Sequence, residues 1–425
     1  MRRRTLLTGS VSATLAPVLA GCGALSPGDD DPDTLVVHNM LTAGSDTAAV
    51  YDRVCGQFEH DHPGARIKNL VSGGTDLVNV YETARLAHKE ADLVMVNLAE
   101  KSLSWTGLGA TVPVGRYLDA WGLRDVFLPQ ALKEWTDARG RVAGFPWNGF
   151  TWPVAYNTRL LKHYGVPRVP VTTGELTAAA HRVRAGGGKG LVSIGGNDWS
   201  GQKLLMQIMQ GYLPPARAAR LFRHGGYAAD PLALRGLELF TRLRDAGVFF
   251  QGAQGLNSDS MKTDYYTGRA PAVSAISSTL AEVPEEVAAV TELGGWPVPP
   301  GGVYRKPTAL RGYTSTGVWI SPNGLKKIGL VRRFVTFLYR PANSRAFVRD
   351  AGQVMAVRGA ADSPRFPLVS RSVRLPPSRI AYAVMPDSYV PPSVSQPLIR
   401  ASSLAYAPGR SARSIAAALD TAYRS

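Results

Sequence analysis

The first hydrophobic pattern of the chain predicts a β-α-β-α-β unit that ends with a strand over residues 92–97. Residues 35–38 form a short apolar run, and Tyr51, Cys55 and Phe58 recur at the spacing of one helix face. Residues 92–97 are almost continuously apolar, as expected of a parallel strand that is covered on both faces. Cys55 is therefore predicted to be a small buried hydrophobe rather than a reactive thiol.

Polar residues follow the strands of this unit. Ligands of parallel sheets bind beyond the carboxyl ends of the strands. We therefore expect Asn39, Thr75 and Asn97 to face one crevice.

A second α/β region follows Gly144. Helical spacing predicts helices over residues 173–185, 232–246 and 325–339. The glycine cluster at residues 186–190 lacks the final Ser or Thr and the glycine spacing of a phosphate-binding loop, so we interpret it as a turn. The chain has 425 residues, which is enough for two domains.

The first residues have the features of a secretory signal. Arg2, Arg3 and Arg4 precede a diluted apolar stretch over residues 6–19, which is shorter than the roughly 20 apolar residues that span a bilayer. The sequence Leu-Ala-Gly-Cys that ends at Cys22 resembles a lipobox, in which the cysteine becomes the acylated first residue of the mature protein.

We therefore expect a signal peptide over residues 1–21, followed by a lipidated Cys22 and its tether over residues 22–33. This arrangement would anchor the protein by lipid to the outer face of the cell membrane. The alternative is a signal peptide with a chance cysteine. Arg3 and Arg4 also resemble part of a twin-arginine signal, which leaves export by the Sec or the twin-arginine route open.

The net charge of +16 is unevenly distributed. From Gly301 onward the chain has 19 Lys and Arg residues against 4 Asp and Glu residues. These charges are scattered, and aromatic residues do not alternate with them, so a nucleic-acid site is not expected. Two interpretations remain: a solvated basic surface near anionic lipid headgroups, or an anionic ligand.

Motifs of the common enzyme classes are absent from the sequence. It contains no G-x-S-x-G, no H-E-x-x-H and no paired cysteine motif. Cys22 and Cys55 are the two cysteines, so no intramolecular disulfide can form once Cys22 is lipidated. His60, Asp61 and His62 could hint at a metal, but a solvated helix end before Pro-Gly is the favoured interpretation.

A secreted enzyme and an adhesion or scaffold lipoprotein are the rival classes. An enzyme would need a convergent acid-base or nucleophile set, which the sequence does not show. A scaffold would need no polar crevice with aromatic residues. We expect a binding protein without catalytic residues, cofactor or metal.

Four stretches of the chain carry a resemblance to a known family: residues 145–157, 265–270, 294–300 and 334–347. They begin with Phe-Pro-Trp, Tyr-Tyr-Thr-Gly, Gly-Gly-Trp-Pro and Phe-Val-Thr-Phe. This ordered set resembles the family 1 extracellular solute-binding proteins, which have the maltose-binding-protein fold. The resemblance extends from Thr34 to about Gly359.

The resemblance implies an α/β fold of two lobes, the type II periplasmic-binding-protein fold. Each lobe would be a mostly parallel sheet flanked by helices, with the ligand cleft between the lobes. We assign residues 34–144 and 276–322 to lobe I, and residues 145–275 and 323–425, with a helical C-terminal segment, to lobe II. The hinge is expected at Gly144, near Ala275 and at residues 321–323.

Several segments resemble the glycerol-phosphate and glycerophosphodiester receptors of this family. They are residues 38–40, 197–199, 277–281 and 375–386. Those receptors carry a carboxylate near Leu98, a tyrosine near Gln353 and an arginine near Tyr382, and the last two help to hold the phosphate. Their absence argues against a phosphodiester, because arginine supplies charged bidentate donors that tyrosine does not.

A carbohydrate fits the remaining residues better, because sugar sites combine amides and hydroxyls with an aromatic platform. The candidate ligand-binding residues are Asn39, Thr75, Asn97, Trp147, Asn148, Asp198, Trp199, Ser277, Thr279, Trp296, Ser315, Gln353 and Tyr382. Trp147, Trp199 and Trp296 are the candidate platforms, although a tryptophan is more often part of a core or wall. Trp319 is expected to be core.

The expected function is that of a substrate-binding lipoprotein of an ABC importer. It would capture a mono- or oligosaccharide, amino sugars included, and deliver it to the membrane permease. The protein is expected to be a monomer. A glycerophosphodiester or glycerol-3-phosphate receptor of the same family is the alternative.

Overall fold

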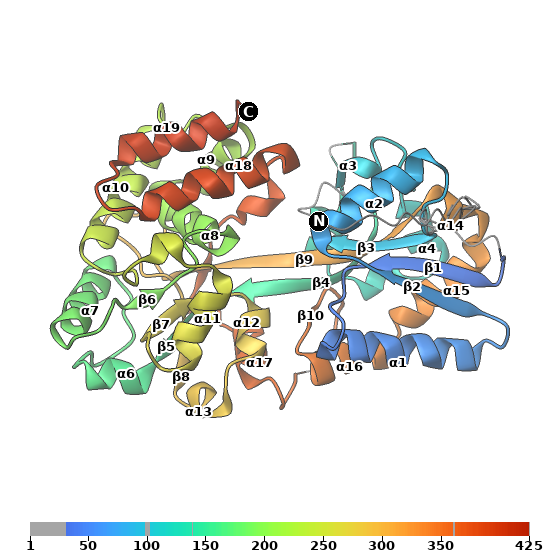
Figure 1. Cartoon of the computed structure of the whole chain (residues 1–425), viewed down its shortest axis with the longest axis horizontal. Coiled ribbons are helices and arrows are strands. Elements are labelled where there is room, and N and C mark those ends of the chain that lie inside the picture. Colours follow the sequence, from blue (N-terminus) through green and yellow to red (C-terminus); the bar gives the residue numbers. More distant parts are fainter. Residues whose placement is uncertain (1–30, 98–102, 138, 360–361, 425) are drawn as a thin grey trace, which may run out of the picture.

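Two α/β lobes are joined by β4 (Phe145–Trp152) and β9 (Thr308–Ile320), which run through the middle of the molecule (Figure 1). The computed structural model describes residues 31–97, 103–137, 139–359 and 362–424. The predicted two-lobe α/β fold is confirmed. The predicted signal peptide and Cys22 lie outside the described residues.

Lobe I is built on one end of a seven-stranded sheet of order β10-β4-β9-β3-β1-β2, with β11 paired to β9. Its elements are β1 (Thr34–Asn39), α1 (Asp46–Asp61), β2 (Arg66–Val71), α2 (Gly74–Leu86), β3 (Leu93–Asn97), α3 (Leu103–Trp105), α4 (Gly115–Ala120), α5 (Pro129–Glu134), α14 (Pro322–Lys326), α15 (Ile328–Leu338), α16 (Pro341–Ala351) and β10 (Val354–Met355). The pairings β1–β2 and β1–β3 are parallel, whereas β9 runs antiparallel to β3 and β4.

Lobe II surrounds a four-stranded sheet of order β6-β7-β5-β8. Its elements are β5 (Val154–Asn157), α6 (Thr158–His163), α7 (Thr173–Ala185), β6 (Val192–Ser193), α8 (Trp199–Met209), α9 (Pro215–His224), α10 (Pro231–Asp245), α11 (Ser258–Tyr266), β7 (Ala272–Ser274), α12 (Ser277–Ala281), α13 (Glu285–Ala288), β8 (Thr291–Gly294), α17 (Pro367–Val373), β11 (Ala381–Tyr382), α18 (Pro392–Ser403) and α19 (Ala412–Ala422). Only β6–β7 is parallel among the described pairs of this sheet, so the prediction of a mostly parallel sheet in each lobe is wrong for lobe II.

The start of lobe I follows directly from its local sequence. Every residue of β1 is buried, and α1 begins after Ser45, whose hydroxyl accepts a hydrogen bond from the Ala48 N–H at 3.2 Å. Tyr51, Cys55 and Phe58 lie on the buried face of α1, as predicted. Burial raises the pKa of the Cys55 thiol to about 12, which keeps it protonated and unreactive.

The two lobes have separate hydrophobic cores. The core of lobe II runs from Val154 to Ala422 along the chain, and the main core of lobe I combines α1 with α15 and α16. A second lobe I cluster on the other face of the sheet contains Trp105, Trp135 and Trp319. Trp319 is fully buried, as expected, and its ring centroid lies 4.5 Å from that of Trp135.

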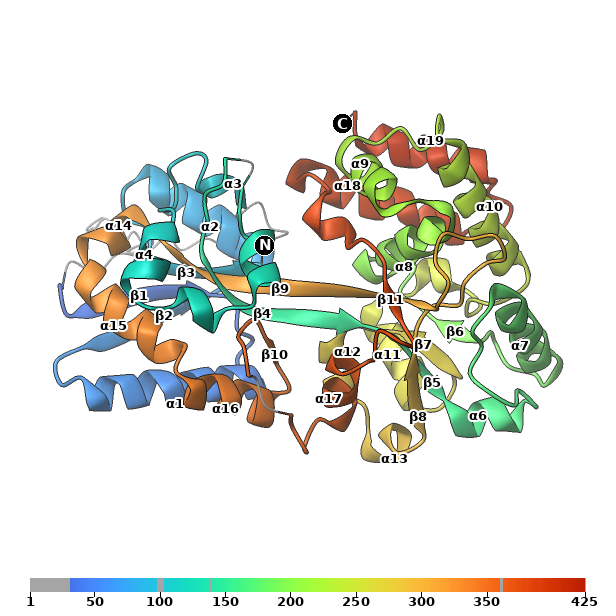
Figure 2. The same ribbon diagram turned by 180° about the vertical axis from the view of Figure 1, so that it is seen from behind.

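The predicted division of the later chain between the lobes is wrong. Residues 277–294 pack into the core of lobe II, and residues 328–351 pack into the core of lobe I. The sequence predicts the opposite assignment of both segments, because it places crossings between the lobes near Ala275 and at residues 321–323. The chain in fact recrosses along β9 and crosses a third time between Val357 and Phe366 (Figures 1 and 2).

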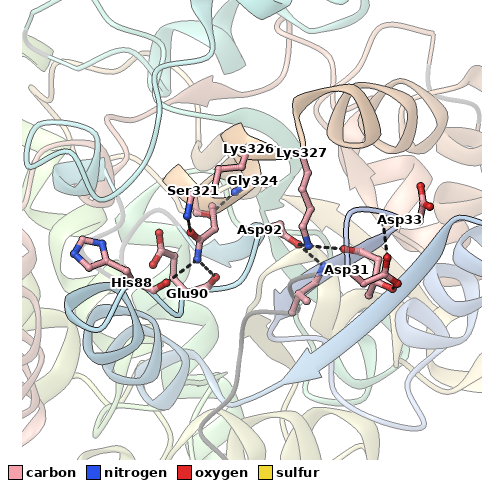
Figure 3. A network of polar contacts seen from close by, with 12 residues as sticks. Asp31, Asp33, His88, Glu90, Asp92, Ser321, Gly324, Lys326 and Lys327 are labelled. Atoms are coloured by element: carbon pink, nitrogen blue, oxygen red, sulfur yellow. Dashed lines mark hydrogen bonds and ion pairs between the residues drawn. The ribbon is translucent and has the colours of Figure 1, made fainter.

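A polar network fastens α14 and α15 to lobe I (Figure 3). The Lys327 ammonium donates to the Thr34 carbonyl at 2.7 Å and pairs with Asp92 at 3.1 Å. Asp92 also accepts the Val36 N–H at 2.8 Å, and the Asn323 side chain donates to the Glu90 carbonyl at 3.0 Å. These contacts anchor the segment after β9 at the beginnings of β1 and β3.

β4 and β9 pass between the lobes in their middle, whereas Ala275 packs into the core of lobe II and residues 321–323 follow β9 within lobe I. A Cβ atom at Gly149 would lie 2.5 Å from the Gly312 carbonyl oxygen, so the two strands approach closely where they cross between the lobes. Register shifts flank this point, between Pro146 and Asn148 and between Asn148 and Phe150. Glycine at both positions and irregular pairing mark this crossing.

Candidate ligand cleft

A cleft of about 750 Å³ lies between the lobes. Lobe I contributes α2, β3 and α5, the crossing strands β4 and β9 form its floor, and lobe II contributes α8, α18 and the segment between β11 and α18. A larger hollow of about 980 Å³ lies on the outside of lobe II between α6 and β8. Because one lobe forms that hollow, lobe movement would not close it around a ligand.

Two tryptophans and Phe150 contribute aromatic rings to the lining of the cleft. Trp199 begins α8 and Trp152 ends β4, and their rings meet edge to face with centroids 5.3 Å apart and an interplanar angle of 78°. Trp199 is 36% exposed, which leaves ring surface available to a ligand. The Trp152 indole N–H donates to the Ser274 hydroxyl at 3.2 Å, and this hydrogen bond holds the Trp152 ring in place.

Asp198 positions Trp199. Its carboxylate accepts the Ser200 N–H at 2.8 Å as the N-cap of α8, and it accepts the Ser258 N–H at 2.5 Å from α11. These bonds use the carboxylate to hold the first turn of α8 in place. The structure therefore places this predicted ligand-binding residue behind the cleft wall.

An ion pair follows the tryptophans on the lobe II wall. Lys203 lies one helical turn after Trp199, and its ammonium lies 2.5 Å from Asp387 in the short helix Pro386–Ser388. The Lys203 side chain is only 7% exposed and also donates to Gln202 at 2.7 Å, whereas Asp387 is 33% exposed. The pair thus presents its carboxylate to the cleft more than its ammonium.

Asn97 and Ser315 meet on the lobe I side of the cleft. The Asn97 amide donates to the Ser315 hydroxyl at 3.1 Å, and both residues line the cleft, as predicted. Amide and hydroxyl groups at the ends of strands can exchange hydrogen bonds with ligand hydroxyls.

Glu134 also lines this side of the cleft. It ends α5, and its two carboxylate oxygens accept the Tyr313 N–H at 3.3 Å and the Thr314 N–H at 3.0 Å from β9. Burial raises the pKa of Glu134 to about 7, although these two hydrogen bonds and the charge of Arg311 favour the ionised form.

Asn148 and Gln353 bridge the crossing strands on their other side. The Asn148 amide donates to Gln353 at 2.7 Å and its oxygen accepts the Thr316 N–H at 3.1 Å. Gln353 donates in turn to Thr47 at 2.8 Å and lines a separate hollow of about 210 Å³. The structure therefore gives these two predicted site residues contacts within the protein.

The other predicted residues lie within the lobes. Trp147 and Trp296 are 1% and 2% exposed and pack against Phe347 and Phe249, respectively. The remaining buried predictions are Asn39, Ser277 and Thr279. Tyr382 is half-buried in β11 beside Arg311, and Thr75 lies in α2 with its side chain outside the described part.

The cleft thus brings together Asn97, Trp199 and Ser315 from the predicted set. Sequence reasoning missed Trp152, Glu134, Lys203 and Asp387. Lys203 had a signal, because it lies four residues after Trp199 and therefore on the same helix face. Glu134 and Asp387 had none, since only the fold brings α5 and the segment before α18 to the cleft.

Known proteins resemble this chain in sequence and in overall fold. Residues 43–344 match the model of the bacterial extracellular solute-binding proteins. A probable secreted solute-binding lipoprotein from Streptomyces coelicolor has 50% sequence identity and a TM-score of 0.85, and the match covers 93% of this chain and 100% of that chain. No curated protein matches the sequence.

More distant solved structures share the fold. A chitin oligosaccharide binding protein has 19% identity and a TM-score of 0.76, over 92% of this chain and 98% of that chain. A maltose-bound protein from T. maritima has 16% identity and a TM-score of 0.72, over 92% of this chain and 99% of that chain.

Proposed function

The chain belongs to the bacterial extracellular solute-binding proteins, and we propose that it captures a carbohydrate in the inter-lobe cleft for the permease of an ABC importer. The observation that carries the proposal is the Trp152–Trp199 wall beside the polar groups of the same cleft. The protein would bind its solute and release it unchanged.

Sugar chemistry fits this wall. A sugar ring has apolar C–H faces and polar hydroxyl edges, so it pairs with an aromatic surface bordered by hydrogen-bonding groups. Trp199 offers the exposed aromatic surface, and Asn97, Ser315 and Asp387 offer donors and acceptors around it. Relatives of the same fold are described as binding a chitin oligosaccharide, maltose and raffinose.

The charge of the cleft argues against the glycerophosphodiester alternative. Lys203 is the one basic residue among the described cleft-lining residues, and Asp387 already pairs with it. A phosphate would need free cationic donors. The basic character of the later chain therefore does not extend to the cleft. This favours the interpretation of the basic residues as a solvated surface.

Closure of the lobes would trap the ligand. The crossing at Gly149 and Gly312 provides a place to bend, and a ligand that contacts both walls stabilises the closed form by the contacts it gains there. The closed protein would then dock on the permease.

The location completes the proposal. Cys22 would carry lipid and hold a monomeric receptor at the outer face of the membrane, by either export route. A lipoprotein relative at 50% identity supports this location. No helix in the described ranges combines the length and the apolar character needed to cross a bilayer.

Thermal-shift screening tests the function. The panel contains chitin, xylo- and malto-oligosaccharides, galactose and raffinose, together with glycerol-3-phosphate and glycerophosphocholine. We expect a sugar to raise the melting temperature, with a dissociation constant that changes little between low and high salt. Small-angle scattering should show compaction with that sugar. Binding of only the phosphate compounds, with strong salt dependence, would overturn the proposal.

A further inference from the structure

We propose that the cleft selects a carbohydrate with a protonated amino group, which Glu134 and Thr314 hold at the cleft floor. The inference rests on the proposed function and narrows the ligand of the same cleft. Its basis is a carboxylate without a cationic partner beside a buried hydroxyl without any hydrogen-bond partner.

The geometry of Glu134 leaves acceptor capacity toward the cleft. Each carboxylate oxygen accepts one backbone N–H of β9, from Tyr313 or Thr314, and an ionised carboxylate accepts up to about four hydrogen bonds. The side chain is held against the floor by these two bonds, so it is already oriented before a ligand arrives. Glu134 forms no ion pair with another described residue.

Thr314 supplies the second observation. The residue is 4% exposed and lines the cleft, and its hydroxyl oxygen has no hydrogen-bond partner among the described residues. Its own N–H donates to Glu134, so the residue that carries this hydroxyl is in contact with the carboxylate. A buried hydroxyl without a partner is unfavourable, and an ammonium, with three N–H donors, would satisfy both groups.

The charged groups around Glu134 do not supply a countercharge by direct contact. Arg311 of β9 lies against the ring of Tyr313, 4.7 Å from its centroid, and lines the hollow on the other side of the strands. In the loop after α5, Arg141 pairs with Asp137 at 2.7 Å. Lys133 is exposed on α5 itself.

Across the cleft, Lys203 is held by Asp387. The cleft lining therefore contains two carboxylates and one ammonium in a chain whose net charge is +16. A cationic ligand would balance this excess of carboxylate, whereas a neutral sugar would leave it unchanged.

The pKa of Glu134, raised to about 7 by burial, gives the preference a pH dependence. Below pH 7 the carboxyl is mostly protonated and pairs poorly with an ammonium. As the pH rises toward 7 the carboxylate forms, and the affinity for a cationic sugar should rise by about tenfold per unit over the range well below the pKa. A neutral sugar should not show this rise.

Isothermal titration calorimetry on the mature protein tests the inference. The probes are glucosamine, galactosamine, mannosamine and chitosan oligomers of two to four units, each compared with its hydroxyl and N-acetyl counterparts at pH 5.5, 6.25 and 7.0. We expect at least one amine to bind at least tenfold more tightly than its neutral counterparts at pH 7.0, and to lose affinity by about tenfold or more at pH 5.5.

Two variants separate a ligand contact from a structural role. Glu134→Gln should remove the preference for the amine and the pH dependence while neutral counterparts still bind, and Thr314→Val should weaken amine binding about tenfold. Glu238→Gln removes an exposed carboxylate of α10 outside the cleft and should change neither.

The possible failures are distinguishable. Neutral or N-acetylated sugars that bind as tightly as the amines, with affinity independent of pH, would overturn this inference and leave the proposed function intact. An amine preference that survives Glu134→Gln would also overturn it. Binding of no sugar at all would overturn both.

Discussion

Trp199 stands edge to face against Trp152, with ring centroids 5.3 Å apart, although 46 residues of lobe II separate the ends of β4 and α8 that carry them. Trp152 is 2% exposed and Trp199 is 36% exposed. The buried ring therefore fixes the orientation of the exposed one, and the pair forms a rigid aromatic surface on the lobe II wall.

Replacement of Trp199 by alanine should weaken sugar binding by about 2 kcal/mol or more, roughly thirtyfold, because the ligand would lose its largest aromatic contact. The melting temperature should change little, since the ring is partly exposed. Calorimetric titration with the best sugar of the panel measures the first quantity, and a thermal melt measures the second.

Trp319→Ala is the matched control. Trp319 is fully buried beside Trp105 and Trp135, so its removal should cost about 3–5 kcal/mol of unfolding free energy and leave the affinity of the folded protein almost unchanged. Equal affinity losses in the two variants would contradict the assignment of Trp199 as the contact surface.

Local patterns predicted the first part of lobe I well. The strand predicted over residues 35–38 is Thr34–Asn39, and the one over residues 92–97 is Leu93–Asn97. These elements are specified by residues close together in the chain, through apolar runs and helix spacing. The pattern therefore contains the information that is needed to place them.

The lobe assignment failed because it depends on long-range pairing. The helices over residues 328–351 are amphipathic. This pattern predicts that one face of each helix is buried, but it does not identify the lobe against which that face packs. The contacts that determine the lobe join residues far apart in the sequence, such as Lys327 and Asp92. Sequence spacing alone does not reveal them.

The site prediction failed where strand register decides. Trp147 and Trp152 both lie on β4, but Trp147 packs into lobe I and Trp152 lines the cleft. Strand side chains alternate between two faces, so residues five positions apart point to opposite sides. The sequence of β4 does not say which of the two faces borders the cleft, and that becomes visible only once β4 is paired with β9.

Glu134 should make the protein less stable as the pH rises, even without ligand. Its folded-state pKa is raised to about 7 by burial, so the folded protein binds the proton more tightly than the unfolded chain does. Stability should therefore be highest below the unfolded pKa and fall by up to about 3 kcal/mol between pH 4.5 and pH 7. Urea unfolding at several pH values measures this slope.

Glu134→Gln is the reference for that experiment, because it cannot titrate. Its absolute stability is not the readout, since its amide meets a backbone N–H that the carboxylate had accepted. The readout is the difference between the pH dependence of the unfolding free energy in the two proteins. Parallel slopes for the two proteins would show that another group titrates in this range.

Gly149→Ala should strain the crossing of β4 and β9, where we propose that the lobes bend. The new Cβ atom would lie 2.5 Å from the Gly312 carbonyl oxygen, so β4 and β9 would have to separate. We expect a loss of about 1–3 kcal/mol in unfolding free energy. The compaction of the protein on sugar binding, measured by small-angle scattering, should also change.

Gly329→Ala on α15 is the control. A Cβ atom there would have nothing within 4 Å, so this substitution should be neutral or stabilising. A Gly149→Ala protein as stable as this control would argue against a close crossing.

Cys22→Ala should abolish lipid attachment, because the thiol that accepts the acyl chain is lost. Metabolic labelling with a radioactive fatty acid, followed by immunoprecipitation, measures this. Cys55→Ala is the matched control and should retain the label, since Cys55 is buried in α1. Label that persists in Cys22→Ala would refute the lipobox interpretation.

The two halves of the Lys203–Asp387 pair should respond unequally to removal. Asp387→Asn would leave the Lys203 ammonium, which is 7% exposed, with neutral amide oxygens as partners and no countercharge. A buried charge without its counterion is unfavourable, so we expect a loss of about 3 kcal/mol in unfolding free energy. Lys203→Met would leave Asp387, which is 33% exposed and can be hydrated, so this variant should lose only about 1 kcal/mol of unfolding free energy.

The double variant should recover part of the loss of Asp387→Asn, because it removes the ammonium that has no countercharge. Urea unfolding of all four proteins completes the cycle. Equal losses in the single variants, with no recovery in the double variant, would mean that the pair does not interact in solution.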